Sequence, residues 1–201
     1  MRAQWLRPIS REAELIRIVL AALAVFAASA SAEVPSRSVY VGIYGGTQLQ
    51  LTSWHLHEAE LVDDTPGPSG VAGLRVGGTV HPLVAIEAAI GVIPFSSASD
   101  ELNVALNYSA DLHLMFFEGD WVPYLDLGAG LYHNIVGDHG SDVAYHVHYG
   151  IGLRGMLTDV LALRIDVRHA VSDGFLDELA HNLEMSVGID FFAWIEQTAA
   201  E

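Results

Sequence analysis

Leu161-Ala162-Leu163-Arg164-Ile165-Asp166-Val167-Arg168 is the stretch of sequence that decides the fold. Its odd positions carry large aliphatic side chains, and its even positions carry small or charged ones. Successive side chains of a strand point to opposite faces, so this alternation predicts a strand with one apolar and one charged face. On a helix the same aliphatic side chains would be scattered around the axis. The question for the whole chain is whether the apolar face meets a protein interior or lipid.

Seven further stretches alternate with the same period of two. Turn signals join some of them closely, at His81-Pro82, Glu118–Asp120 and Thr158-Asp159, whereas the other links are longer. Short and long links alternate, so all short turns lie at one end, and an even number of up-and-down strands closes without free edges. We therefore predict an all-β, eight-stranded antiparallel up-and-down barrel over about residues 38–194. The seven stretches are Val39–Leu51, Val71–Val80, Val84–Phe95, Leu102–Phe116, Val122–Val136, Val143–Met156 and Asn182–Trp194.

The size and charge of the side chains indicate which face is inside. The interior of an eight-stranded barrel is only just wide enough for side chains. The polar face is rich in Gly, Ala, Ser and Asn, which suit such a space, and the apolar face carries the larger Leu, Ile and Val. A face in water would be rich in Lys and Glu, yet the chain has no lysine. The sequence therefore predicts a transmembrane barrel with a polar interior and an apolar wall toward lipid.

The N-terminal residues 1–32 have the pattern of a secretory signal peptide. Arginines precede the apolar segment Ile18–Ala30, and Ala30-Ser31-Ala32 is a cleavage motif, with cleavage after Ala30 as an alternative. A membrane-spanning helix is the less favoured interpretation, because spanning needs about 20 apolar residues. We expect the mature protein, residues 33–201, to be one barrel domain in the outer membrane of a bacterium.

Aromatic residues gather near both predicted ends of the barrel. Aromatic girdles form where amphipathic rings settle at headgroup depth, and the alternative is that these rings simply pack among other side chains. We predict two girdles. The short-turn end contributes Phe116, Phe117, Trp121, Phe191, Phe192 and Trp194, and the long-loop end contributes Trp54, Phe95 and Tyr145.

The C-terminal part of the chain resembles a known family. Gly150–Arg154, the turn Thr158-Asp159, the strand 161–168 and the segment Asn182–Phe191 resemble the last two hairpins of the OmpA-like eight-stranded outer-membrane β-barrel family. The resemblance implies recognition of the last strand by the barrel-insertion machinery. In this sequence residues 195–201 follow the terminal aromatic residues. No peptidoglycan-binding domain follows, so the cell-wall tether of two-domain relatives is not expected.

The charged face predicts a network inside the barrel. Charges in a narrow, poorly hydrated space must pair, because an unpaired buried charge costs several kcal/mol. We expect the arginines and carboxylates to form ion pairs that plug the lumen, and a gated ion path with exchanging pairs is the alternative. Carboxylates outnumber arginines, which leaves room for a protonated carboxyl group or a bound water. The predicted members are Arg75, Glu87, Asp111, Asp126, Arg154, Arg164, Asp166, Arg168, Glu184 and Asp190.

Other chemistry has weaker support in the sequence. The net charge of −16 argues against nucleic acid as a partner, and without cysteine a thiolate site is excluded. His55-x-His57 and His146-x-His148 have a chelating spacing, but no third ligand is fixed, so we predict polar lumen or rim histidines and no metal or cofactor. His169 and Ser172 invite comparison with lipid-modifying hydrolases, but a surface turn is the favoured interpretation, and we expect no enzyme.

The predicted long loops are acidic. Loop carboxylates near the phosphates of lipopolysaccharide would repel them unless divalent cations bridge the two, and a simply solvated loop surface is the favoured alternative. We expect a non-enzymatic outer-membrane barrel with an envelope-structural or surface-contact role. A small passive or gated pore is the next hypothesis, and a soluble lipocalin-like ligand carrier, with its apolar face inside, is the last. The acidic loop residues are Glu58, Glu60, Asp63, Asp64, Asp100, Glu101, Asp138, Asp142, Asp173, Asp177 and Glu178.

Overall fold

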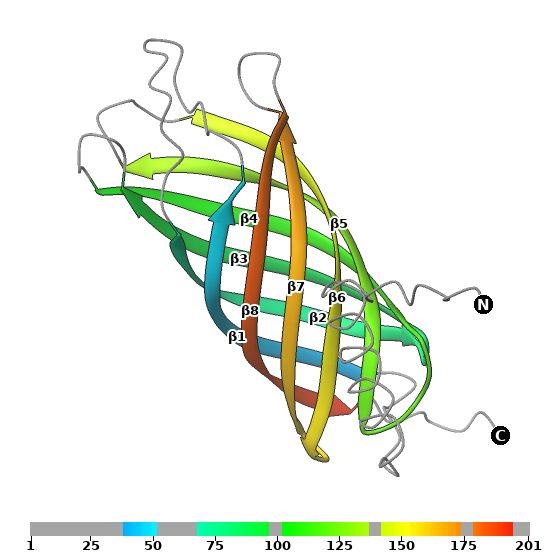
Figure 1. Ribbon diagram of the computed structural model, residues 1–201. Coiled ribbons are helices and arrows are strands. Elements are labelled where there is room, and N and C mark those ends of the chain that lie inside the picture. Colours follow the sequence, from blue (N-terminus) through cyan, green and yellow to red (C-terminus); the bar gives the residue numbers. More distant parts are fainter. Residues whose placement is uncertain (1–37, 52–67, 97–101, 137–141, 174–178, 195–201) are drawn as a thin grey trace, which may run out of the picture.

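Eight antiparallel strands follow one another around a barrel in sequence order, and β1 pairs with β8 to close it (Figure 1). The computed structural model describes residues 38–51, 68–96, 102–136, 142–173 and 179–194. This topology is the predicted one. The strands are β1 (Ser38–Gln50), β2 (Ser69–His81), β3 (Val84–Ser96), β4 (Leu102–Met115), β5 (Trp121–Val136), β6 (Asp142–Thr158), β7 (Leu161–Asp173) and β8 (Leu179–Trp194).

The short links all lie at one end of the barrel, as predicted. Residues 82–83, 116–120 and 159–160 join β2 to β3, β4 to β5 and β6 to β7. In the second of these turns Gly119 has a φ of 154°, which favours glycine. Two strands start earlier than predicted because their pairing continues toward the loops: Ser69 pairs with Gln48, and Leu179 pairs with Asp173. The predicted signal peptide lies outside the described residues.

Within the described ranges, the chain has no helix of the length and apolarity that a membrane crossing requires.

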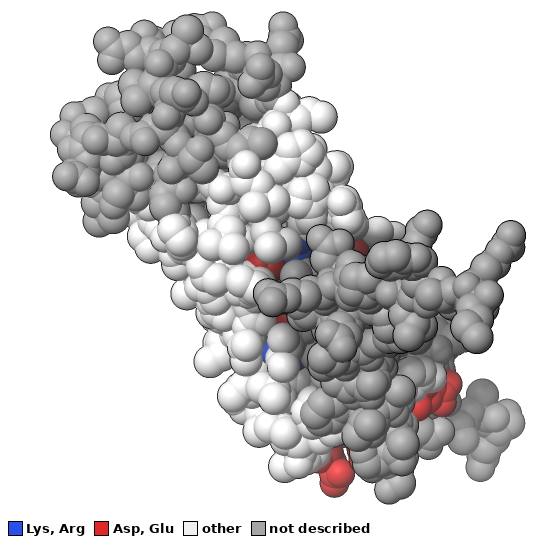
Figure 2. All heavy atoms as spheres, viewed as in Figure 1, with Lys and Arg blue, Asp and Glu red and all other residues white. Residues whose placement is uncertain are grey.

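The two faces of β7 show which way the barrel is turned. Ile165 and Val167 point outward, with 42% and 38% of their surface exposed, whereas Arg164 and Asp166 are buried in the interior. The other strands repeat this alternation, and the described part of the face in Figure 2 is largely uncharged. The polar interior and apolar wall are therefore as predicted. A ligand carrier with an apolar cavity needs the opposite arrangement, and the lipocalin-like alternative is wrong.

Side chains fill the interior, and aromatic residues pack near both of its ends. Tyr40 and Phe192 contact each other at the short-turn end, with ring centroids 5.1 Å apart. Phe95 and Tyr132 belong to a cluster nearer the long loops. Glycines on the inner wall make room for some of these rings: a Cβ at Gly152 would overlap Tyr124. The charged side chains lie between the two aromatic regions.

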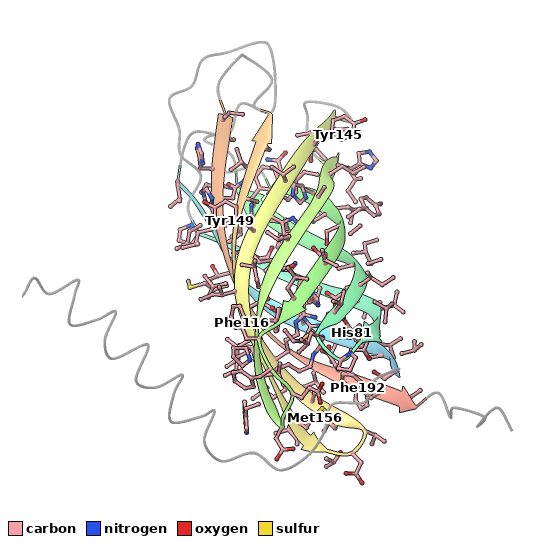
Figure 3. The ribbon with its side chains drawn as sticks, turned by 90° about the vertical axis from the view of Figure 1, so that its right-hand side faces the viewer. His81, Phe116, Tyr145, Tyr149, Met156 and Phe192 are labelled. Atoms are coloured by element: carbon pink, nitrogen blue, oxygen red, sulfur yellow. The ribbon has the colours of Figure 1, made fainter. Side chains whose placement is uncertain are left out.

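Some of the predicted girdle residues lie on the outer wall of the barrel, and two point inward. Phe116, Phe191 and Tyr145 are well exposed on the outer wall, and Figure 3 shows Tyr145 near the long-loop end and Phe116 far from it. Phe95 and Phe192, however, point inward, with only 6% and 5% of their surface exposed. The reason is position along the strand: Phe95 shares the inward side of β3 with Glu87, and Phe192 that of β8 with Asp190.

The other predicted girdle residues have different surroundings. Phe117 is exposed in the short turn, and Trp121 is half-buried where a Cβ at Gly155 of the neighbouring strand would overlap its ring. Trp54 and the side chain of Trp194 lie outside the described part of the structure.

Candidate functional site

The candidate site is a chain of alternating arginines and carboxylates that crosses the interior. Arg75 of β2 contacts Asp190 of β8 at 2.7 Å and Asp166 of β7 at 3.2 Å. Arg164 contacts Asp166 at 2.9 Å and Glu87 of β3 at 2.5 Å. These contacts join β2 and β3 to β7 and β8, so the ion pairs tie together walls that are far apart in the sequence.

Arg168 and Arg154 extend this chain in both directions. Arg168 contacts Asp126 of β5 at 2.6 Å and Glu87 at 3.9 Å. Arg154 contacts Asp190 at 3.7 Å. Four arginines and four carboxylates thus form one network with balanced formal charge, as fully buried charges require. We call these eight residues the lumen network: Arg75, Glu87, Asp126, Arg154, Arg164, Asp166, Arg168 and Asp190.

Arg154 is held by aromatic rings as well as by charge. Its guanidinium carbon lies 4.6 Å from the ring centroid of Tyr40, 5.5 Å from that of Phe192 and 5.8 Å from that of Tyr124. A cation over the face of an aromatic ring is stabilised by the negative potential there. This end of the lumen network is therefore enclosed by rings on the side of the short turns.

Two predicted members do not join the lumen network. Asp111 pairs with His148 and accepts a hydrogen bond from Ser109 at 2.9 Å. Glu184 forms no ion pair within the described residues. The sequence had shown that carboxylates outnumber arginines, and the structure shows where the surplus lies. Asp111 is near the long-loop half of the barrel, where two histidines of β6 also point inward.

Sequence reasoning missed three residues that bind the lumen network. Tyr40 donates a hydrogen bond to Glu87 at 2.8 Å, and Tyr124 donates one to Asp166 and contacts the Arg164 Nε at 2.5 Å. His113 lies 3.4 Å from Asp126 and 3.3 Å from Arg164. The alternating pattern could have identified them, because all three occupy inward-facing positions of their strands.

The histidines and the serine considered for other chemistry lie apart from one another. Ser172 is buried in the interior, whereas His169 lies on the outer wall, where its Nδ1 is 2.9 Å from the Tyr149 hydroxyl. The two side chains therefore do not form a hydrolase pair. His55 and His57 fall outside the described residues. Asp111, Asp126 and His148 place donor atoms within 4.8 Å of one another, which is a grouping that can hold a metal ion.

Most of the chain matches the sequence model of one protein family. The model of the outer membrane protein beta-barrel domain matches residues 18–191. The chain belongs to this family. The predicted resemblance to eight-stranded outer-membrane barrels is thereby confirmed, and membership places this outer-membrane barrel in the outer membrane of a bacterium. No curated protein matches the sequence.

Solved structures show the same fold at low sequence identity. Neisserial surface protein A is 12% identical, with a TM-score of 0.53, and the match covers 80% of this chain and 99% of that one. OprG from Pseudomonas aeruginosa is 11% identical, also with a TM-score of 0.53, and the match covers 80% of this chain and 99% of OprG. At these identities the likeness concerns the fold alone.

Within this outer-membrane barrel the side chains of the lumen network are buried and closely packed. The gap lined by Tyr44, Arg75, Glu87 and Arg168 is too small to admit a water molecule. Each guanidinium is planar and offers fixed donors, so it holds its carboxylates in place more rigidly than an ammonium group would. The ion pairs join β2 and β3 to β7 and β8 across the interior.

Proposed function

We propose that this protein is a non-enzymatic outer-membrane barrel with an envelope-structural or surface-contact role, and that the lumen network plugs it. The observation that carries the proposal is the continuous alternation of charges from Arg154 through Asp190, Arg75, Asp166, Arg164 and Glu87 to Arg168. A closed interior leaves the outer wall and the loops as the surfaces for contact with other molecules.

Energetics favour a plug over a gate. Removing one partner from a buried ion pair typically costs about 3–5 kcal/mol, because the other charge stays buried and unpaired. A gate that exchanges partners would pass through such states. Arg164 contacts Glu87, Asp166 and Tyr124 together, so its movement would break several of these contacts at once.

Conductance in planar lipid bilayers tests the plug. We expect no unitary current from the purified wild-type protein. Arg75→Ala combined with Arg164→Ala should open a path and produce a cation-preferring current, because the carboxylates of Asp166, Asp190 and Glu87 lose their nearest arginines. The matched control is Glu87→Gln with Arg164→Met, which removes one charge of each sign and keeps side chains of similar size.

The two outcomes separate the leading function from the pore. The control variant should stay silent, and the double alanine variant should conduct. A reproducible unitary current from the wild type, abolished when the lumen is blocked, would instead establish a small pore and would end the plug proposal.

The acidic loops support the surface-contact role. Carboxylates such as Glu58, Glu60, Asp63 and Asp64 belong to the first long loop, whose structure is outside the described residues. We propose that divalent cations bridge such carboxylates to lipopolysaccharide phosphates. Lipopolysaccharide binding should then require Ca²⁺ or Mg²⁺ and fall on chelation. Changing these four residues to their amides should weaken it, and binding that ignores both treatments contradicts this role.

A further inference from the structure

Two inward-facing histidines of β6 meet in the long-loop half of the interior. The Nδ1 atoms of His146 and His148 face each other at 3.4 Å, and both side chains are buried. The opposite nitrogen of each ring faces an oxygen atom of β4: His146 Nε2 is 3.0 Å from Asn107 Oδ1, and His148 Nε2 contacts Asp111 Oδ1. Each imidazole is therefore held at Nε2 by an oxygen atom of β4, and the two Nδ1 atoms converge on each other.

Two glycines of β5 create the space for these rings. Gly128 pairs with His148 and also with Asp111, and Gly130 pairs with His146. A Cβ at Gly128 would overlap the His148 ring, and one at Gly130 would come within 2.6 Å of His146 Nε2. The sequence thus places Gly-x-Gly beside His-x-His, so that both imidazoles lie across β5 and reach the oxygens of β4.

The positions of the ring hydrogens make the contact between the two Nδ1 atoms unusual. Because both Nε2 atoms face oxygens, both donate their hydrogen there, and each neutral ring then presents a lone pair at Nδ1. Two lone pairs at 3.4 Å repel unless a proton or a metal cation lies between them. Two nitrogens bound tetrahedrally to one ion at about 2.0–2.1 Å would be about 3.3–3.4 Å apart.

We propose that His146 and His148 bind a first-row divalent metal ion such as Zn²⁺ through their Nδ1 atoms, with water completing its coordination. Metal-bound histidines usually donate their other N–H to a carboxylate or carbonyl oxygen, which is the role of Asp111 and Asn107 here. Imidazole suits Zn²⁺, Cu²⁺ and Ni²⁺ better than Mg²⁺ or Ca²⁺. The proposal is independent of the plug.

The local charge agrees with a bound cation. The formal charges of the lumen network sum to zero. Asp111 is a buried carboxylate outside this network, and its ion-pair partner is His148 and not an arginine. The carboxylate of Asp126, which lies near His148 and Asp111, is held by Arg168 at 2.6 Å. A divalent ion at the two Nδ1 atoms would therefore offset the surplus negative charge of this half of the interior.

A second histidine pair, on the outer wall, has a different arrangement and provides the matched control. His181 Nδ1 lies 3.2 Å from His169 Nε2, and the Tyr149 hydroxyl lies 2.9 Å from His169 Nδ1. A hydrogen bond from Tyr149 to His169 and another from His169 to His181 satisfy these contacts without a cation.

Zn²⁺ binding to the detergent-solubilised mature protein, purified without a histidine tag, tests the site. In equilibrium dialysis, the double variant His146→Gln/His148→Gln should bind one Zn²⁺ fewer per molecule than the wild type, because the affinity of this site should fall at least about tenfold. The double variant His169→Gln/His181→Gln should bind like the wild type. Asp111→Asn should weaken binding by about tenfold through the orientation of His148. Mobility on unheated SDS gels checks that each variant keeps its barrel.

Cu²⁺ provides a second readout that does not depend on affinity. The electron paramagnetic resonance spectrum of one bound Cu²⁺ should show two imidazole nitrogens in the wild type and in the outer-wall variant, and lose them in His146→Gln/His148→Gln. The proposal is overturned if the folded wild type binds no Zn²⁺, or if the interior double variant binds it as tightly as the wild type does.

Discussion

At the scale of single residues, position along a strand matters more than residue type. Phe191 and Phe192 are adjacent and chemically identical, yet 53% of Phe191 is exposed on the outer wall and Phe192 packs on Tyr40 inside. The prediction of girdles from residue type placed both in lipid. The alternation that places Arg164 and Asp166 inside also places Phe192 inside, whereas residue type alone does not distinguish the two rings.

Substitutions at this pair should therefore have unequal effects. Phe192→Ala should lower the free energy of unfolding by about 3–5 kcal/mol, because it leaves a cavity beside Tyr40 and removes a ring from Arg154. Phe191→Ala should cost clearly less, since lipid can fill the space. Urea unfolding in lipid vesicles measures both, and equal losses would contradict the assigned faces.

The members of the interior site were predictable at this scale, but their partners were not. Alternation identified all ten charged residues as inward-facing, and they are buried. Which arginine meets which carboxylate depends on the stagger between strands. Arg75 reaches Asp190 across β1, and this contact depends on a register that no single strand encodes. The pairing of His146 and His148 with Asn107 and Asp111 was hidden for the same reason.

At the scale of strands, small residues on one strand make room for large ones on the next. Gly152 of β6 pairs with Tyr124 of β5, whose ring lies over it. The number and order of the strands followed from the period of two and the turn signals. Their ends did not, because pairing toward the loops, as between Leu179 and Asp173, continues through residues without a clear alternation.

Alanine substitutions at two glycines test this packing. Gly152→Ala should destabilise the barrel by about 1–3 kcal/mol, because Tyr124 is fixed by Asp166 and Arg164 and cannot move away from the new Cβ. At Gly45, on the outer wall, the Cβ would meet only Val71 O at 3.6 Å, so Gly45→Ala should be neutral or slightly stabilising. Thermal unfolding in detergent compares the two, and a similar loss in both would count against the packing argument.

At the scale of the whole molecule, the apolar outer wall is matched to lipid. The network inside is balanced, and the wall presents aliphatic side chains from every strand. The stability of the barrel should therefore depend on the depth at which a charge is introduced on the wall, and not only on the number of charges.

A depth comparison tests this orientation. Val167 lies at the middle of β7, and Val160 lies in the short turn before it. Val167→Arg should cost about 2–4 kcal/mol, as expected at the bilayer midplane, and Val160→Arg only about 0–1 kcal/mol near the interface. Reversible unfolding from phospholipid vesicles gives both values. A wall that faced water would tolerate the two changes equally.

The burial of every described arginine makes proteolysis a sensor of folding. Trypsin cleaves only after Arg or Lys, the chain has no lysine, and Arg75, Arg154, Arg164 and Arg168 are enclosed by the barrel. The segments 52–67, 97–101, 137–141 and 174–178 contain neither residue type. Trypsin therefore finds no accessible bond between residues 38 and 194 of the intact protein, and each fragment from this region reports a molecule that had opened.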